Sequence, residues 1–257
     1  MIQSPRLKLT PETDETLDGV GDAAAFLQKK KGQRLASDDI LLAAMAVRAM
    51  PNARTMLDLG TGKGSVALMS LSALPKLSAV GVEAFDESFR LAVRNARLNQ
   101  QQDRFTPMFA DIRSLDGKLG SKTFDLITGA PPFMKVGHGV MPQNKQRQYG
   151  RFELRGGIEA YCAAVGTYLN QRRGKYVLLM DARNESRTRR ALSERGLHLE
   201  TLIEVLPRPK QPPIYQIFVG SYTKHTFGSY CIAMRSETGD HWTEDYAQLR
   251  TSIGLEC

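Results

Sequence analysis

The segment Gly60-Thr61-Gly62-Lys63-Gly64 carries three glycines at alternate positions, and it is the part of the sequence best suited to hold a ligand. An apolar strand over residues 55–59 leads into it, and helical character follows from Val66 to Leu74. Glycine permits a tight turn and lets a ligand touch bare backbone, which a Cβ would prevent. The amides at the start of the helix then face whatever lies above the end of the strand.

An acidic residue follows the next expected strand. Residues 77–82 are apolar and end in Glu83, about 20 residues beyond the glycine turn, the spacing at which an acid binds ribose hydroxyls. The two features together indicate a site for a nucleoside cofactor. The residues that we expect to form it are Asp58, Gly60, Thr61, Gly62, Gly64 and Glu83.

Two further turns follow the third and fourth expected strands. Asp111 is placed to accept a hydrogen bond from an adenine amino group, although an ordinary N-cap or loop aspartate is the alternative. Pro131-Pro132-Phe133 follows a strand at 123–128. The two prolines fix φ and remove two amide donors, so carbonyl oxygens remain as the exposed polar groups beside an aromatic ring.

The elements that must position these residues alternate regularly. Strands are expected near 55–59, 77–83, 105–109 and 123–128, with helices near 65–74 and 86–98. This alternation is typical of a Rossmann-like α/β fold, in which a mostly parallel sheet carries helices on both faces. Ligands of such sheets bind beyond the carboxyl ends of the strands, so the candidate residues should meet there.

The flanking sequence predicts an N-terminal extension over residues 1–50 and one catalytic domain over 51–257. Residues 1–20 are polar and are expected to form a loose arm. Ser37 or Asp38 can cap a helix through 40–47, which Pro51 ends. Beyond residue 156 we expect helices at 157–169 and 185–195, strands at 175–180, 198–206, 214–222 and 229–235 that include an antiparallel C-terminal pair, and a proline-rich loop at 207–213.

The polar segment from residue 134 to 155 is too long for a simple connection and is expected to be a binding loop. It follows directly on the Pro-Pro-Phe turn. The basic helix at 185–195, with Arg187, is most simply solvated on its charged face, and a solvated turn is also the simpler interpretation of Lys29-Lys30-Lys31.

The composition of the chain is basic, and its few cysteines are far apart in the sequence. The chain has 257 residues with 35 Lys and Arg against 27 Asp and Glu, a net charge of +8 and a pI near 9.5. This excess suits a polyanion, although many solvated surfaces are as basic. Cys162, Cys231 and Cys257 are widely spaced and form no CxxC motif. We therefore expect the cysteines to be reduced thiols in a cytoplasmic protein. We also expect no bound metal, no membrane span and a monomeric or weakly dimeric protein.

Together these motifs resemble the class I AdoMet-dependent methyltransferases, and the Pro-Pro-Phe turn resembles the Asn/Asp-Pro-Pro-Tyr/Phe motif of those that methylate amino nitrogens. More closely, the chain resembles the bacterial tRNA-Val adenine-N6 methyltransferases. The segments that carry this resemblance are 26–34 with Asp38 and 41–43, 207–213 and 237–246.

The resemblance implies S-adenosyl-L-methionine (AdoMet) as cofactor, S-adenosyl-L-homocysteine as product, and an adenosine in a tRNA anticodon loop as substrate. It adds Arg34, Asp111 and Ile112 to the cofactor site and assigns the chemistry to Ala130, Pro131, Pro132 and Phe133. Phosphate contacts are expected from Lys29, Lys30, Lys31, Arg34, Lys135, Arg147, Arg151 and Arg155, and Asn144 is expected at the substrate.

Ala130 departs from the motif, because asparagine or aspartate is expected there to accept a hydrogen bond from the amine. Gln143, Asn144 or Gln148 is a candidate replacement acceptor. Three alternative functions therefore stay open: methylation of another amine, such as a guanine N2 in rRNA or a protein glutamine, a catalytically silent AdoMet-binding protein, and an NAD-dependent dehydrogenase. The GxGxG spacing, rather than GxGxxG, counts against the dehydrogenase.

Overall fold

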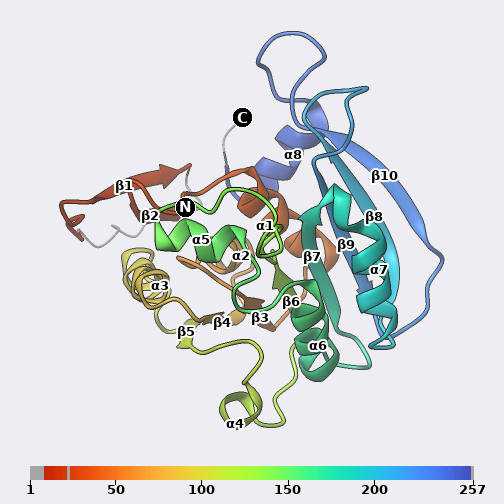
Figure 1. The fold of residues 1–257 in the computed structure, drawn as a ribbon, viewed down its shortest axis with the longest axis horizontal. Coiled ribbons are helices and arrows are strands. Elements are labelled where there is room, and N and C mark those ends of the chain that lie inside the picture. The colour runs from red at the N-terminus through yellow and green to blue at the C-terminus, as the bar shows by residue number, and fades with distance from the viewer. Residues whose placement is uncertain (1–8, 22–23, 256–257) are drawn as a thin grey trace.

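The computed structural model describes residues 9–21 and 24–255. An eight-stranded sheet runs through the molecule in the order β10-β8-β9-β7-β6-β3-β4-β5, with helices on both faces (Figure 1). Its strands are β3 (Thr55–Leu59), β4 (Ser78–Glu83), β5 (Phe105–Phe109), β6 (Leu126–Gly129), β7 (Lys175–Asp181), β8 (His198–Leu206), β9 (Tyr215–Ser221) and β10 (Gly228–Ala233).

The sheet is parallel except at β9, which lies antiparallel between β7 and β8. The remaining pairs, β3 with β4 and β6, β4 with β5, β6 with β7, and β8 with β10, are parallel. The expected Rossmann-like sheet with an antiparallel C-terminal strand pair is confirmed. The carboxyl ends of β3, β4, β5 and β6 consequently share one edge.

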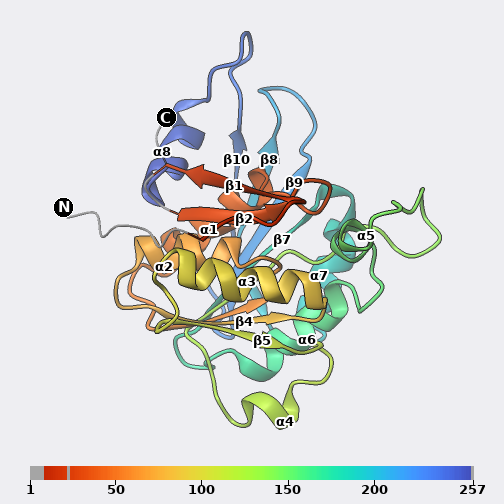
Figure 2. The ribbon, with the colours of Figure 1, turned by 90° about the vertical axis from the view of Figure 1, so that its left-hand side faces the viewer.

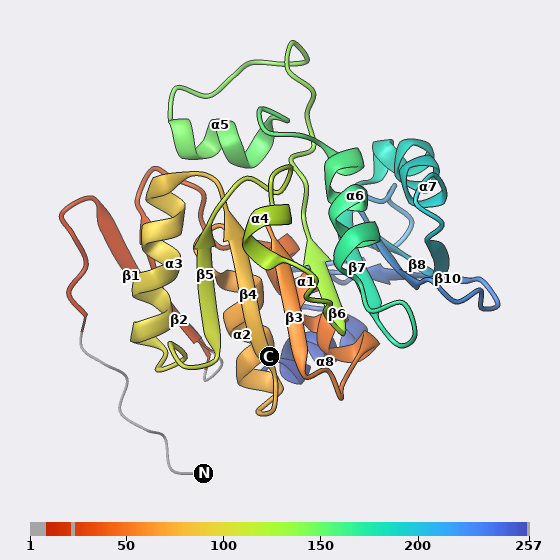
Figure 3. The same ribbon diagram turned by 90° about the horizontal axis from the view of Figure 1, so that it is seen from below.

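Helices cover both faces of this sheet (Figure 3). One face packs against α1 (Ser37–Ala49), α2 (Ser65–Ala73) and α8 (Glu244–Ser252), whose buried residues share one apolar core. The other face packs against α6 (Ile158–Tyr168) and α7 (Glu185–Ser193). The remaining helices are α3 (Asp86–Leu98), α4 (Asp116–Leu119), α5 (Lys145–Arg151) and the 3₁₀ turn η1 (Ala182–Asn184).

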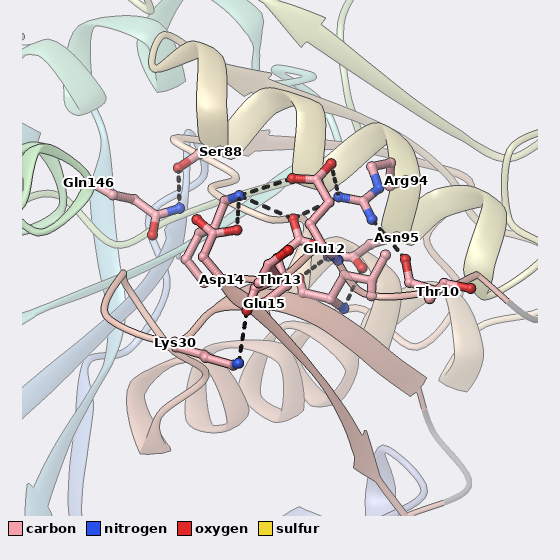
Figure 4. Close-up of polar contacts among 12 residues, drawn as sticks. Thr10, Glu12, Thr13, Asp14, Glu15, Lys30, Ser88, Arg94, Asn95 and Gln146 are labelled. Carbon is pink, nitrogen blue, oxygen red and sulfur yellow. Dashed lines mark hydrogen bonds and ion pairs between the residues drawn. The ribbon is translucent and has the colours of Figure 1, made fainter.

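The N-terminal residues form a hairpin, so the expectation of a loose arm over residues 1–20 is wrong for residues 15–20. Residues 1–8 lie outside the described part of the chain. Strand β1 (Glu15–Val20) pairs antiparallel with β2 (Ala24–Lys29) above α3 (Figure 2). Strand β2 is almost entirely buried, and the Glu15 carboxylate ties its strand to Arg94 of α3 at 2.7 Å (Figure 4). Buried pairing therefore orders a segment whose composition is polar.

Three local expectations also need correction. Helix α1 is capped by Ala36 rather than by Ser37 or Asp38, because the Asp39 side chain reaches back and accepts from the Ala36 amide at 3.1 Å. The segment 134–155 is not an irregular loop, since it contains α5. Arg187 is only 15% exposed, because it forms ion pairs with Glu153 and Glu159 at 2.5 and 2.6 Å instead of facing solvent.

The other expected elements are present within a few residues of their predicted ends, and residues 207–213 connect β8 to β9 as expected. Cys162 and Cys231 are free thiols, and Cys257 lies outside the described residues. None of the helices in the described ranges combines the length and the apolar character that a membrane crossing requires.

Candidate active site

A cavity of about 480 Å³ opens at the carboxyl ends of β3, β4 and β6. Its wall combines the glycine turn with the Pro-Pro-Phe turn, and α5 and its flanking segments lie above this edge of the sheet (Figure 3). The sequence-predicted residues that line it are Gly60, Thr61, Gly62, Glu83, Asp111, Ile112, Ala130, Pro131, Pro132, Phe133, Arg151 and Arg155.

The glycine turn needs glycine for two different reasons. Gly60, Gly62 and Gly64 all have positive φ, at 66°, 59° and 87°. A Cβ on Gly60 would lie 2.3 Å from the Tyr161 hydroxyl, whereas a Cβ on Gly62 would meet no protein atom within 4 Å. Gly60 is thus required by packing beneath the turn. Gly62 presents bare backbone to open space, which is the condition for close approach of a ligand.

Asp58 lies beneath this turn and does not line the cavity. Its carboxylate accepts hydrogen bonds from the Thr61 and Thr128 hydroxyls, both at 2.6 Å. Burial raises the pKa of Asp58 to about 6, against the lowering effect of the two hydroxyls. Asp58 therefore joins β3, β6 and the glycine turn, and its contact with the cavity runs through Thr61.

Glu83 lines the cavity opposite the turn. Its carboxylate accepts from the Gly62 amide at 2.9 Å and from the Phe85 amide at 2.6 Å. Burial raises the pKa of Glu83 in spite of these donors. Because an ionised carboxylate offers about four lone pairs, two remain for the hydroxyls of a ligand.

Asp111 is held by its own loop. The Arg113 guanidinium donates to it at 2.9 and 2.7 Å, and these bonds hold the pKa of Asp111 below its usual value. The Asp111 side chain and Ile112 both line the cavity. The Asp111 carboxylate is thereby oriented as well as ionised.

The three residues of the Pro-Pro-Phe turn line the cavity. The Phe133 ring lies 5.8 Å from the Tyr215 ring at 47°, and Asn184 donates to the Phe133 carbonyl at 3.4 Å. The turn is therefore braced from β9 and from η1. Ala130, which precedes it, has no polar side-chain atom.

The three candidate replacement acceptors in the following segment lie away from the cavity wall. Asn144 Oδ1 accepts from the Arg147 amide at 3.0 Å as the cap of α5, and Gln148 Nε2 donates to the Pro142 carbonyl at 2.7 Å. Gln143, Asn144 and Gln148 all lie off the cavity wall. The Asn144 oxygen and the Gln148 amide nitrogen are thus used within α5 and the chain before it.

The expected phosphate-binding side chains are distributed unevenly. Lys29 is only 13% exposed and forms ion pairs with Glu12, Asp14 and Glu15, so a phosphate contact through Lys29 does not fit this arrangement. Lys135 is exposed beyond the cavity. A neighbouring hollow is lined by Lys30, Lys31, Arg34, Asn144, Arg147 and Arg151. Arg34 thus lies outside the cofactor cavity to which it was assigned.

Phe85 and Tyr149 line the cavity but were not identified from sequence. Arg155 donates to the Ala84 carbonyl at 2.6 Å and lies 4.9 Å above the Tyr149 ring, which in turn stacks on Phe85 at 4.9 Å. Tyr149 comes from α5, so only folding brings it there. Asp38, at the start of α1, also lines the cavity, although the sequence marks it only as a possible helix cap and as part of the family resemblance.

Comparison with known proteins agrees with this geometry. A family model described as methyltransferase small domain matches residues 35–145, which include both turns of the cavity. The chain belongs to the class I AdoMet-dependent methyltransferases. Among solved structures of this methyltransferase fold, a predicted O-methyltransferase from Agrobacterium tumefaciens has a TM-score of 0.63 at 17% identity, covering 84% of this chain and 97% of that one. The family implies AdoMet as methyl donor.

The sequence relatives are named for two different substrates, an adenine of tRNA and a glutamine of a release factor. A tRNA1(Val) (adenine(37)-N6)-methyltransferase of Glaesserella parasuis is 34% identical over 45% of this chain and 46% of its own length. One of Porphyromonas gingivalis is 29% identical over 68% of this chain and 71% of its own length. A release factor glutamine methyltransferase of Aliivibrio fischeri is 37% identical, but over only 33% of this chain and 28% of its own length.

Proposed function

We propose that this methyltransferase transfers a methyl group to the N6 amine of an adenosine in tRNA, within the anticodon loop. One observation carries the proposal: the Pro-Pro-Phe turn shares a single cavity with the glycine turn. The relatives named as tRNA adenine-N6 methyltransferases support the choice of acceptor, since two of them align over at least two thirds of their own length.

The donor side of the cavity fits AdoMet. Gly62 leaves open space where any other residue would place a side chain, and Glu83 keeps lone pairs for ribose hydroxyls. Asp111 and Ile112 would take the adenine ring, with the carboxylate accepting from its amino group. When bound, AdoMet supplies a methyl group on a positively charged sulfur, which a nucleophile can attack.

The acceptor side must make a weak nucleophile reactive. The lone pair of an exocyclic adenine amine is delocalised into the ring, and hydrogen-bond acceptors on its two hydrogens favour a pyramidal nitrogen whose lone pair points at the donor. The Pro131 carbonyl is suited to be one acceptor, and the Phe133 ring can stack on the base. The methylated amine is acidic enough to lose its proton to water, so the mechanism needs no general base.

The alanine at position 130 lowers the expected rate without removing the mechanism. One hydrogen bond formed mainly in the transition state contributes about 1–3 kcal/mol, or roughly ten- to hundredfold in rate. Alignment of amine and donor contributes about 7–11 kcal/mol. Positioning is therefore the larger effect.

A glutamine side chain on a protein is the second candidate acceptor, favoured by the match to the release factor methyltransferase. An amide nitrogen is also a delocalised amine, and the same turn could hold it.

The decisive experiment measures transfer of labelled methyl from AdoMet to unmodified tRNA, rRNA and a release factor in parallel, followed by mapping of the methylated atom. We expect N6-methyladenosine in the anticodon loop of a tRNA. Label in a protein glutamine or an rRNA guanine would refute the adenine assignment. Tight binding of S-adenosylhomocysteine with no transfer to any substrate would identify a silent binding protein, and binding of NAD instead would refute methyl transfer.

A further inference from the structure

A second hollow, of about 680 Å³, adjoins the active cavity. One wall is the segment 30–36 between β2 and α1, and the other consists of residues from 142 to 151 around α5. Gln33, Ala36 and Arg151 line both hollows, so the two are continuous. We call this hollow the basic groove, after Lys30, Lys31, Arg34, Arg147 and Arg151 on its walls.

The charge of the basic groove is unbalanced. Its lining includes five cationic side chains and no Asp or Glu. Arg34 forms an ion pair with Asp18 at 3.0 Å, and Lys30 donates to the Thr13 carbonyl at 2.9 Å (Figure 4). Within residues 9–21 and 24–255, Lys31, Arg147 and Arg151 have no carboxylate at ion-pair distance. Such a concentration of like charge favours an anionic ligand.

The two walls of the basic groove are fastened to each other, although more than 100 residues separate them. The Gln146 side chain is buried; its Oε1 accepts from the Gln33 amide at 2.7 Å, and its Nε2 donates to the Ser88 hydroxyl at 3.0 Å. A Cβ on Gly32 would lie 1.8 Å from Gln146 Oε1, so glycine permits this contact. The cationic side chains therefore project from a fixed frame.

We propose that the basic groove binds the phosphates that flank the target nucleotide of a single-stranded RNA loop. This proposal rests on the proposed function. A nucleotide whose base enters the cavity must leave its neighbouring phosphates at the rim, and Arg151 lies on the rim that the cavity and the groove share. Lysine and arginine side chains bind phosphate without regard to base sequence, so the groove would position the RNA and leave recognition of the base to the cavity.

The test compares tRNA binding by Lys31→Ala and Arg147→Ala with binding by Lys122→Ala, an exposed lysine outside both hollows. We expect each groove variant to weaken tRNA binding about fivefold or more and to reduce the slope of log affinity against log salt by roughly 1. Affinity for S-adenosylhomocysteine should be unchanged, and Lys122→Ala should match the wild type.

The outcomes separate the basic groove from the proposed function. Groove variants with wild-type affinity and salt slope, in a protein that methylates tRNA, would overturn the groove alone. A wild-type protein that neither binds nor methylates tRNA would overturn both proposals. Loss of binding to an acidic release factor in the same variants, with tRNA binding retained, would show that the groove receives a protein.

A different observation concerns the carboxylates of the active cavity. Asp38 Oδ1 is buried and, among the described residues, has no hydrogen-bond partner. The other cavity carboxylates each accept from a neighbour: Asp39 from Ser65, Glu83 from Gly62, Asp111 from Arg113 and Asp181 from Arg183. Asp38 Oδ1 is thus an acceptor that lacks a partner within the described protein, on a residue that lines the cavity.

The Asp38 carboxyl lies near both sides of the cavity, close to Lys63 of the glycine turn and to Tyr215, whose ring packs on Phe133. Helix α1 packs across β6, β7 and β9, the strands whose ends carry Ala130, Asp181 and Tyr215. Burial first, and then the Asp38 charge, raise the pKa of Tyr215, the residue whose ring packs on Phe133. We infer that Asp38 Oδ1 accepts a hydrogen bond from the amine that is methylated, in the role that the side chain at position 130 cannot fill.

The test measures single-turnover methyl transfer and AdoMet affinity for Asp38→Asn, Asp38→Ala and the double variant Asp38→Ala, Ala130→Asn. We expect Asp38→Ala to lower the rate at least tenfold with unchanged AdoMet affinity, and the added asparagine to restore most of it. Asp38→Asn, which keeps an acceptor oxygen, should retain more activity than Asp38→Ala.

Two results would overturn this inference. A weakened AdoMet affinity with an unchanged single-turnover rate would assign the carboxylate to the donor. A loss of rate that the asparagine at position 130 does not repair would show that the two positions serve different atoms. Urea unfolding of each variant distinguishes these results from loss of the fold, and wild-type transfer to tRNA is established first.

Discussion

At the scale of single residues, the cavity is shaped by a few side chains with opposite requirements. Gly62 must offer no side chain, Asp58 must be buried to hold Thr61 and Thr128, and Phe133 must be braced by Tyr215. Ala130 also lines the cavity, but its methyl side chain can form no hydrogen bond and, unlike Gly62, it does not leave the backbone bare for a ligand. The chemistry of the site therefore depends on contacts made around position 130 rather than by it.

Restoring an acceptor at position 130 should increase the rate. The Ala130→Asn variant adds an amide oxygen beside the Pro131 carbonyl, where the amine hydrogens are expected. We expect methyl transfer to tRNA to rise by up to about tenfold, equivalent to about 1.4 kcal/mol. Single-turnover rates at saturating AdoMet measure this change, and Ala130→Val serves as a control for added volume. An unchanged rate in this variant, together with an unchanged rate when the same asparagine is added to Asp38→Ala, would mean that the methylated group is not an adenine-like amine.

The buried carboxyl of Asp58 should make stability depend on pH. Burial raises its pKa from 3.8 to about 6, so the folded protein holds this proton more tightly than the unfolded chain. A raised carboxyl pKa means that the stability contribution is lost as pH rises between these two values. Asp58→Asn removes the titration; its amide oxygen can accept from one threonine hydroxyl, and its NH₂ group can donate to the other. Relative to wild type, its unfolding free energy should improve by about 2 kcal/mol between pH 4 and 7, at about 1.4 kcal/mol per pKa unit.

Urea unfolding at a series of pH values measures this difference. Several other carboxyls have lowered pKa values, so their titration makes the protein more stable as the pH rises. These carboxyls are present in both proteins, so their contribution is removed when the unfolding free energy of the wild type is subtracted from that of the variant. If the unfolding free energies of the variant and the wild type differ by the same amount at every pH from 4 to 7, Asp58 does not cause the expected pH dependence.

At the scale of elements, the hairpin β1–β2 is joined to the cofactor turn through α3. Asn95 accepts from the Leu27 amide at 2.8 Å and donates to the Leu27 and Lys63 carbonyls at 3.1 and 3.0 Å. Asn99, one helical turn later, makes the corresponding pair of bonds with Ala25 at 2.8 and 2.7 Å. Both asparagines satisfy backbone groups of β2, but only Asn95 reaches the glycine turn.

This difference supplies a matched pair of variants. Asn95→Ala leaves buried backbone groups unpaired, so we expect a loss of about 2–4 kcal/mol of stability and a weaker affinity for S-adenosylhomocysteine. Asn99→Ala should also lower stability but should leave that affinity unchanged. Denaturant unfolding and calorimetric titration measure the two quantities. Equal cofactor affinity in the two variants would show that α3 does not position the turn.

At the scale of the whole molecule, one core runs through most of the chain. The apolar cluster that begins at Ala24 and Phe26 includes α1 and the sheet, and ends at Leu255 after α8. The segment proposed as an N-terminal extension, residues 1–50, therefore contributes buried residues to the same core as the remainder. The boundary at residue 50 stays a prediction from sequence.

A shared core should unfold in one step. Trp242, the single tryptophan, packs on Tyr246 of α8 and reports the C-terminal region, whereas far-UV circular dichroism reports all helices. We expect the two signals to give the same transition midpoint in urea. Separate midpoints would show that the C-terminal region and the rest of the sheet are independent folding units.

The sequence by itself determined the features that depend on local backbone geometry and on period. The alternation of strand and helix predicts the parallel sheet, and glycines with positive φ or consecutive prolines mark turns regardless of the surrounding fold. Gly60–Gly64, Glu83, Asp111 and the Pro-Pro-Phe turn could therefore be assigned to one edge of the sheet from spacing alone.

Only the tertiary structure decided the features that depend on partners distant in sequence. Strand β1 forms because it pairs with β2 and because Arg94 forms an ion pair with the buried Glu15. The Arg187 side chain is mostly shielded from solvent because it forms ion pairs with Glu153 and Glu159. The basic groove exists because Gln146 joins α5 to Gln33 across 113 residues. Such contacts gain their free energy from burial and pairing that the chain makes only when folded, and no local pattern encodes them.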